Sequence, residues 1–370
     1  MMEPNLSLLD RLGALRRVVA VLTFVALLAG ITVPTMSDAQ DQPPSGAAAG
    51  EVPGQSLGNQ SDSDLWRAIR QGNPGMVTIP NQQAAVLIQS EGEDWRSIRN
   101  GPVSIYGATI MLGMVAFLAA FFTLRGRIRI EAGFSGRTIT RFNLFERFCH
   151  WLTAISFIVL ALTGLNLLYG RDVLIPVIGK DAFHVVANIG QFLHHYVAFP
   201  FMAGLVLVFI LWARHNFLDK VDFVWMSQAG GLFTKGVHPP SKKFNFGQKI
   251  IFWVTILGGI SLSLSGLQLL FPYEFPMFGA TFAALNLIGF DLPAALTPLQ
   301  EQQLAQIWHS TVALILIAVY IAHVYIGSVG MQGAFAAMGS GKVDINWAKE
   351  HHNLWVEDVQ RKAADKTPAE

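Results

Sequence analysis

Five long apolar stretches constrain the fold of this chain more than any other feature of its sequence. Each is long enough to cross the roughly 30 Å hydrocarbon core of a bilayer as an α-helix. The composition agrees, because 52% of the 370 residues are hydrophobic and only 14% are charged. We therefore predict an all-α integral membrane protein with five transmembrane helices. The stretches lie at about 103–124, 145–169, 193–214, 249–271 and 304–329.

The beginning of the chain is typical of an exported protein. Three arginines among the first 17 residues precede an apolar run from Val18 to Val33, and small residues follow near Ala39. This pattern predicts a signal peptide over residues 1–39, with an uncleaved signal anchor as the alternative. Residues 40–102 then have a linker-like composition, rich in Gln, Pro, Gly, Ser and Asp. We predict that they form an exported segment that either docks on a partner or carries small surface helices.

The loops between the apolar stretches differ sharply in charge. Residues 125–144 contain five arginines, and four lysines lie between the third and fourth stretches. Residues 272–303, by contrast, contain neither lysine nor arginine. The positive-inside rule therefore places the basic loops and the C-terminal tail, 331–370, in the cytoplasm. The exported segment then lies on the periplasmic side of a bacterial inner membrane.

Cys149 is the only cysteine in the sequence. A single cysteine excludes an internal disulfide, a C-x-x-C-H site for covalent haem and a four-cysteine iron–sulfur cluster on this chain. Any haem bound here is therefore held non-covalently, and any cluster belongs to a partner.

Two histidines, His309 and His323, lie fourteen residues apart in the last apolar stretch. Fourteen residues of α-helix rise about 21 Å and complete about four turns, so both imidazoles share one face. Ionisable side chains at such depths are costly and usually functional. The pair suits one axial ligand for each of two stacked haems, whereas hydrogen bonding between helices is the structural alternative.

Depth in the membrane gives each of these histidines a partner. His150 lies at the cytoplasmic start of the second stretch, at the depth of His323, and His194 or His195 lies at the depth of His309. Ligation by two histidines fills both axial positions of the iron, which favours electron transfer over bond-making chemistry. We interpret the other histidines as surface or interface residues: His184, His215, His238, His351 and His352.

Two further patterns leave alternatives open. Leu162-Thr163-Gly164-Leu165 is echoed by Leu264-Ser265-Gly266-Leu267, so a small residue on each helix allows close approach either of a planar group or of another helix. Asn245 and Gln248 precede the fourth stretch at the depth of His150. Their side chains either donate hydrogen bonds to a quinone carbonyl or cap the following helix.

The last 230 or so residues resemble the cytochrome b (gamma) subunit of respiratory formate dehydrogenases. The sequence is similar to a long form with an N-terminal signal and one extra transmembrane helix, so the resemblance implies a four-helix haem-binding transmembrane core that follows one additional N-terminal transmembrane helix. The matching motifs are Arg147-Phe148-Cys149-His150-Trp151, His215-Asn216 followed by Asp219-Lys220 and Asp222, Asn245-x-Gly247-Gln248-Lys249, His309 and His323 with their spacing, and Trp347-Ala348-Lys349 with His351-His352.

The resemblance implies two haem b groups. Its four ligands fall on His150 and His323 for the cytoplasmic-side haem and on His194 and His309 for the periplasmic-side haem. It also implies menaquinone or ubiquinone as the electron acceptor, bound near Asn245 and Gln248. Formate would be oxidised on an exported subunit with a molybdenum or tungsten pterin cofactor, and an iron–sulfur subunit would deliver the electrons. The family further suggests a trimer of heterotrimers.

Three other functions are alternatives to the formate dehydrogenase subunit, and each predicts different sequence features or a different optical spectrum. The cytochrome b subunit of a membrane-bound nickel–iron hydrogenase is broadly similar, but the C-terminal tail and the Asn-x-Gly-Gln-Lys element favour the formate type. A membrane metalloprotease or metal transporter would need ligands at one depth, often in an H-E-x-x-H helix, and this motif is absent from the sequence. A haem-free structural anchor would differ from a cytochrome in its optical spectrum.

Overall fold

The computed structural model describes residues 91–272 and 274–365, together with Gln71. The predicted signal peptide and most of the predicted exported segment lie outside these residues. The chain divides into two compact units. Unit 1 contains Gly107–Ser263 and the chain from Val312 onward, and unit 2 contains the described residues up to Tyr106 and Leu264–Thr311.

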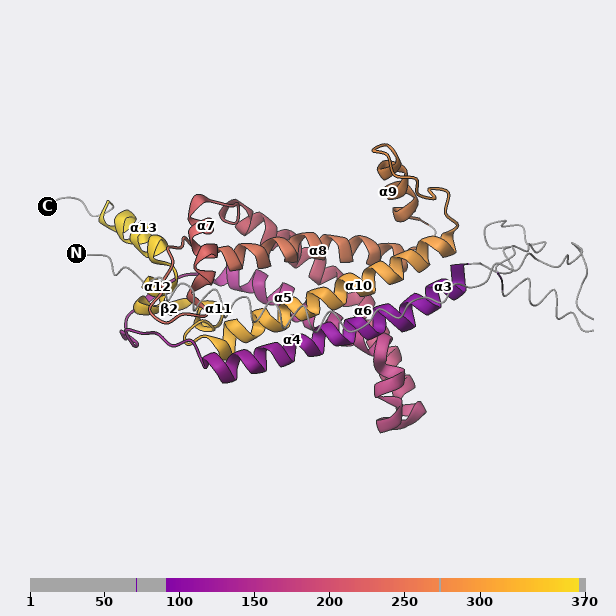
Figure 1. Cartoon of the computed structure of the whole chain (residues 1–370), viewed down its shortest axis with the longest axis horizontal. Helices are drawn as coiled ribbons and strands as arrows, with labels where there is room; N and C mark the ends of the chain where they lie inside the picture. Colours follow the sequence, from indigo (N-terminus) through magenta and orange to yellow (C-terminus); the bar gives the residue numbers. More distant parts are fainter. Residues whose placement is uncertain (1–70, 72–90, 273, 366–370) are drawn as a thin grey trace, which may run out of the picture. The chain divides into compact units, whose positions relative to one another are not determined.

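Five helices of the described chain are long and apolar enough to cross a membrane (Figure 1). This result confirms the predicted all-α membrane fold. Short helices α3 (Glu91–Ile98) and η2 (Arg99–Val103) precede the first of them. The five long helices are α4 (Ser104–Arg125), α5 (Leu144–Val173), α6 (Ile175–Trp212), α8 (Phe246–Leu270) and α10 (Pro298–Tyr325).

Helices α5 and α6 form an antiparallel hairpin that is longer than the sequence predicts. Asn143 and Glu146 form a reciprocal capping box at the start of α5, with both hydrogen bonds at 2.9 Å. Gly179, with a φ of 77°, kinks the first turn of α6. His184 lies within helix α6, and its side chain is exposed, as predicted. The two helices approach closely at Gly204, where a Cβ would lie 3.1 Å from the backbone nitrogen of Thr153.

The N-terminal helix α4 packs against α10 and a neighbouring loop within unit 1. A Cβ on Gly107 would lie 2.4 Å from Leu314, which shows how closely the two helices approach. At the other end of α4, Arg125 Nε donates a hydrogen bond of 2.9 Å to the carbonyl oxygen of Leu232. The ring of Phe121 contacts that of Phe233 at 5.6 Å. The additional helix is therefore joined to the four-helix core at both ends.

A compact polar cap covers one end of unit 1. Strand β1 (Thr138–Thr140) pairs antiparallel with β2 (Lys342–Asp344), so the segment before α5 joins the C-terminal tail. Arg141 lies 5.5 Å from the ring of Trp347 and 5.1 Å from that of Trp355, and burial lowers the pKa of its guanidinium to about 9. The other elements of the cap are η3 (Ala213–His215), α7 (Lys220–Ser227), η4 (Ala229–Gly231), η5 (Ile326–Gly330), α11 (Ala336–Gly339), α12 (Ile345–His351) and α13 (Asn353–Ala364).

Unit 2 contains a short helix that the sequence analysis did not predict, α9 (Met277–Asn286). The buried carboxylate of Glu301 accepts hydrogen bonds from the backbone amides of Phe278 and Gly279, which lie in the first turn of α9. An acidic side chain is favourable at this position because the amides of a first helical turn lack partners within the helix. Gln268 on α8 donates a third hydrogen bond to Glu301, at 2.8 Å.

Candidate haem-binding site

His150 on α5 and His323 on α10 lie close together, with their ring centroids 6.4 Å apart. Imidazole nitrogens bind transition-metal ions at about 2 Å, so one ion between two such rings separates their centres by roughly 6 Å. No hydrogen bond from the described residues reaches the buried Nδ1 of His150. The predicted pair is therefore brought together, and its spacing fits two axial ligands of one haem iron.

Aromatic side chains surround this pair. The ring of Trp151 packs edge-on against His150, and its Nε1 donates a hydrogen bond of 3.0 Å to the carbonyl oxygen of Met338. Tyr320 lies one helical turn before His323 and donates its hydroxyl hydrogen to Thr255 at 2.9 Å. These contacts fix the rings beside the histidines.

His194 on α6 is held by a hydroxyl group from α5. Thr163 Oγ1 lies 2.8 Å from Nδ1 of His194, and the same hydroxyl donates to the carbonyl oxygen of Val159 at 2.8 Å. A hydroxyl has one hydrogen, so with that hydrogen on Val159 it accepts from the imidazole. Nδ1 of His194 then carries the proton.

His309 has a matching arrangement in unit 2. Ser265 Oγ, on α8, lies 2.9 Å from Nδ1 of His309. A Cβ on Gly266 would lie 3.4 Å from Cε1 of His309, and a Cβ on Gly164 would lie 3.4 Å from Cε1 of His194. The repeated Thr/Ser-Gly pattern therefore places a hydroxyl and a small residue against one histidine in each helix pair.

The two adjacent histidines of α6 differ in their surroundings. The ring of His195 is exposed, whereas His194 is partly buried and bonded to Thr163. The choice of His194 over His195 as a haem ligand stays a prediction. The pairing of His194 with His309 stays a prediction, because His194 belongs to unit 1 and His309 to unit 2.

Asn245 and Gln248 cap helix α8. The backbone amide of Gln248 donates to Asn245 Oδ1 at 2.9 Å, and the amide of Asn245 donates to Gln248 Oε1 at 3.1 Å. This reciprocal pair is the capping alternative from the sequence analysis. The side-chain carbonyl oxygens of Asn245 and Gln248 accept these two hydrogen bonds. The side-chain NH₂ groups are the donors that the two residues could present to a ligand.

The histidines near the C-terminus are not all at the surface. His352 is only 1% exposed and shares hydrogen bonds with Ser241 and the carbonyl oxygen of Lys242. Its predicted surface or interface position is therefore wrong. Burial holds the pKa of His352 well below its ordinary value, and the nearby Arg141 lowers it further. A residue bonded in this way has a structural role in the cap.

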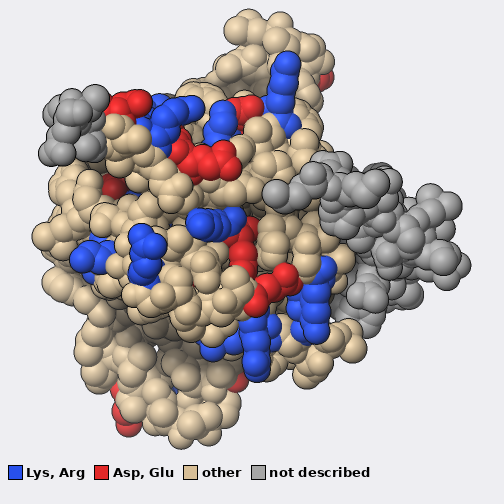
Figure 2. Space-filling model, turned by 90° about the vertical axis from the view of Figure 1, so that its left-hand side faces the viewer, with Lys and Arg blue, Asp and Glu red and all other residues tan. Residues whose placement is uncertain are grey.

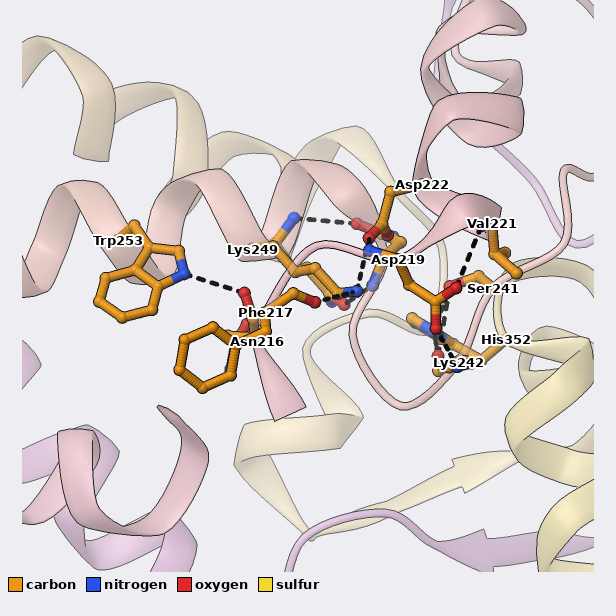
Figure 3. A network of polar contacts seen from close by, with 12 residues as sticks. Asn216, Phe217, Asp219, Val221, Asp222, Ser241, Lys242, Lys249, Trp253 and His352 are labelled. Atoms are coloured by element: carbon orange, nitrogen blue, oxygen red, sulfur yellow. Dashed lines mark hydrogen bonds and ion pairs between the residues drawn. The ribbon is translucent and has the colours of Figure 1, made fainter. Parts of the chain in front are cut away.

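A buried ion pair beside α8 was not assigned a role from the sequence (Figure 3). Lys249 Nζ lies 2.7 Å from Asp222 Oδ2 and donates a hydrogen bond of 3.0 Å to the carbonyl oxygen of Phe217. Asp222 also belongs to the capping box of α7 with Asp219, and Lys242 pairs with Asp219 nearer the surface. Lys249 and Asp222 both stand in motifs that carry the family resemblance, but neither motif shows that Lys249 pairs with Asp222.

An apolar groove of about 670 Å³ runs along this part of α8. Phe246, Trp253 and Gly258 line it on α8, and Val312 and Ile315 line it on α10. The aliphatic part of Lys249 also contributes to its wall. Grooves of this size and character accommodate the hydrocarbon part of small ligands.

Comparison with known proteins identifies relatives over most of this region. The family model described as prokaryotic cytochrome b561 matches residues 141–341. The formate dehydrogenase cytochrome b556(fdo) subunit of Escherichia coli (strain K12) is 29% identical over 225 residues, 60% of this chain and 94% of the relative. The nitrate-inducible cytochrome b556(Fdn) subunit of the same strain is 25% identical over 237 residues, covering 63% and 97%. The formate dehydrogenase cytochrome b556 subunit of Haemophilus influenzae is 22% identical over 223 residues, covering 60% and 83%.

These matches confirm the resemblance that the sequence motifs indicated. The matched residues 141–341 include all four predicted haem ligands together with Asn245 and Gln248, whereas the additional helix α4 precedes them. The chain belongs to the prokaryotic cytochrome b561 family, and the relatives named above are cytochrome b556 subunits of formate dehydrogenases.

Proposed function

We propose that this chain is the cytochrome b subunit of a respiratory formate dehydrogenase and passes electrons through two b haems to a quinone. One observation carries the proposal: α10 presents two histidines at different depths, and His150 faces one of them at a ring separation of 6.4 Å. Histidine at both axial positions leaves no open site for substrate, so the bound group would supply reversible one-electron transfer.

His150 and His323 would hold one haem, and His194 and His309 the other. Thr163 and Ser265 would keep the second pair in orientation through their contacts with Nδ1. His309 and His323 both lie on helix α10.

The distribution of charge supports the proposed orientation. Lys and Arg side chains, with Asp and Glu between them, gather on the end of unit 1 that carries α12 and α13 (Figure 2). By the positive-inside rule, this end would lie in the cytoplasm. His150 and His323 would then lie near the cytoplasm, and the exported pterin and iron–sulfur subunits would reach the side of His194 and His309.

Quinone would be reduced beside the cytoplasmic-side haem. The NH₂ groups of Asn245 and Gln248 would donate hydrogen bonds to a quinone carbonyl, and the apolar groove along α8 is suited to its hydrocarbon tail. Protons for quinol formation would come from the cytoplasm. Formate oxidation would release protons outside, so the two half-reactions together would build a proton gradient.

An optical spectrum of the purified complex tests the proposal. The reduced-minus-oxidised difference should show b-type haem at two per chain, reducible by formate and re-oxidised by a quinone. His323→Ala should leave one haem and abolish quinone reduction, whereas His184→Ala should retain both haems. A wild-type complex without b-type absorption, or a His323→Ala variant with two haems, would overturn the assignment.

A further inference from the structure

The short helix α7 of unit 1 exposes an apolar surface, although it lies in the connection between the membrane spans α6 and α8. Phe223 is 60% exposed, and Leu218, just before the helix, is 64% exposed. We call this region the α7 surface, and its members are Phe217, Leu218, Phe223, Val224 and Met226. Large apolar side chains gathered in this way are unfavourable in water, so the α7 surface requires an apolar partner.

The opposite side of α7 is fixed to the first turn of α8. The ring of Trp225 lies 6.2 Å from that of Phe246, and a Cβ on Gly247 would lie 3.1 Å from the Trp225 ring. Asp222 of α7 pairs with Lys249 of α8 at 2.7 Å (Figure 3). The residues contacted on α8 are the first four of its membrane span. Helix α7 is therefore held at the level where α8 enters the bilayer.

The α7 surface is continuous with the outer side of two membrane spans. Phe217 and Leu218 line the apolar groove together with Leu257 on α8 and Ile315 on α10. Leu257 and Ile315 are themselves exposed, and both lie within spans long enough to cross the membrane. Exposed apolar side chains of such spans face the hydrocarbon of the bilayer. The same hydrocarbon can therefore extend over the α7 surface.

The charges around α7 favour a phospholipid over a protein as the partner. Residues 213–249 contain six lysine and arginine residues but only two acidic ones, and each of these two aspartates is paired with a lysine. Lys220 is exposed and, three residues before Phe223, shares its face of the helix. The aliphatic part of a lysine packs along apolar surface while its ammonium group reaches lipid phosphates. Apolar side chains beside an excess of positive charge are typical of helices that lie in a membrane surface.

We propose that the α7 surface is inserted into the phospholipid leaflet beside the polar cap. Phe223 and Met226 lie among the acyl chains, and Lys220 lies at the level of the headgroup phosphates. Helix α7 is then an interfacial helix that fixes the depth of the cap against the bilayer, through its contacts with the first turn of α8. This inference goes beyond the proposed function, because it concerns only the surface of unit 1 and requires neither haem nor quinone.

Spin labels on single cysteines test the position of α7. Cys149 is the only cysteine of the chain and is fully buried, so Phe223→Cys and Met226→Cys each add one accessible thiol, and wild type is the blank. The full-length chain, with any subunits that purify with it, is reconstituted in vesicles of phosphatidylethanolamine and phosphatidylglycerol. Electron paramagnetic resonance then compares collisions of each label with oxygen, which concentrates in lipid, and with a water-soluble nickel chelate. Leu162→Cys on the exposed side of α5 is the lipid control, and Lys362→Cys on α13 is the water control.

Both labels on α7 should collide more often with oxygen than with the nickel chelate, as the Leu162→Cys label does, and this ratio should reverse for Lys362→Cys. A ratio at either α7 position that matches Lys362→Cys would show that α7 faces water and would overturn the inference. Labels shielded from both reagents would also overturn it, because a protein would then cover the α7 surface. If one of the two α7 variants fails to assemble, the other decides the question. The haem content of the chain is measured separately, so either proposal can fail without the other.

Discussion

The carboxylate of Glu301 accepts a hydrogen bond of 2.6 Å from the backbone amide of Gly279. Because Glu301 is on α10 and also bonds Gln268 on α8, one side chain joins three helices of unit 2. Glu301 is 4% exposed, so water does not replace a lost partner. The carboxylate therefore fixes α9 beside the helices that carry Ser265 and His309.

Replacing Glu301 should release α9. Glu301→Ala leaves two backbone amides and the Gln268 amide without an acceptor, at a cost of about 2–4 kcal/mol. Hydrogen exchange of the peptide covering residues 277–286 should accelerate accordingly. Glu274→Gln, an exposed change in the same connecting segment, is the control. Unchanged exchange in Glu301→Ala would show that α9 is held by other contacts.

The two adjacent histidines of α6 should respond differently to substitution. His194→Ala removes the ring that Thr163 orients, so one haem per chain should be lost. His195→Ala changes an exposed ring and should retain both haems. The ratio of haem to protein in the purified complex measures the difference. Loss of haem from His195→Ala with retention in His194→Ala would reverse the assignment.

A larger residue at Gly204 should separate α5 from α6. The added Cβ would lie 2.5 Å from Thr153 Oγ1 and 3.2 Å from its Cα, and a helix backbone does not move as easily as a flexible side chain. We expect Gly204→Ala to destabilise the protein by about 1–3 kcal/mol. Its thermal midpoint should fall, while Gly113→Ala on α4, where no atom lies within 4 Å, should match wild type. Equal thermal midpoints for Gly204→Ala and wild type would mean that α5 and α6 are not closely packed at Gly204.

The tail should open at acid pH. Burial lowers the pKa of His351 to about 4, and the positive charges of His238 and Arg141 act in the same direction, whereas Glu131 opposes them. The unfolded tail binds a proton at an ordinary histidine pKa of about 6.5, so stability is present at neutral pH and is lost as the pH falls from 6.5 towards 4.

This single histidine accounts for up to about 3 kcal/mol over that range. Limited proteolysis of residues 345–364 in the complex should therefore become faster between pH 7 and pH 4.5. His351→Gln removes the titrating group, and its rate should depend less on pH than that of wild type. An identical pH dependence in the two proteins would assign the effect to other groups, including His352.

The apolar stretches predicted the five long helices because length and hydropathy alone decide which segments cross a bilayer. The ends of α5 and α6 were harder to predict. Arg171, Asp172, Lys180 and Asp181 interrupt the hydropathy, although the helices continue through or beside them. Polar residues near the membrane surface lower the hydropathy of a segment without ending its helix.

The candidate site could also be predicted only in part from the sequence. The spacing of His309 and His323 predicted sites at two depths, because a helix has a fixed rise per residue. The residues that contact each imidazole could be identified only from the structure. Thr163 and His194 are 31 residues apart, and Lys249 and Asp222 are 27 apart, so no local pattern connects them. His352 was predicted at the surface because its burial depends on segments more than 100 residues away.

The short sheet of β1 and β2 has a consequence for the order in which the protein is assembled. Thr140 pairs with Lys342, and the amides of Glu131 and Ala132 donate to Glu350, 219 and 218 residues further along the chain. During synthesis these partners emerge after helices α5 to α10, so the strand that leads into α5 cannot pair with them until those helices have been made. Closure of the cap therefore comes late in biogenesis, and a chain truncated before Lys342 would carry every proposed haem ligand and still lack it.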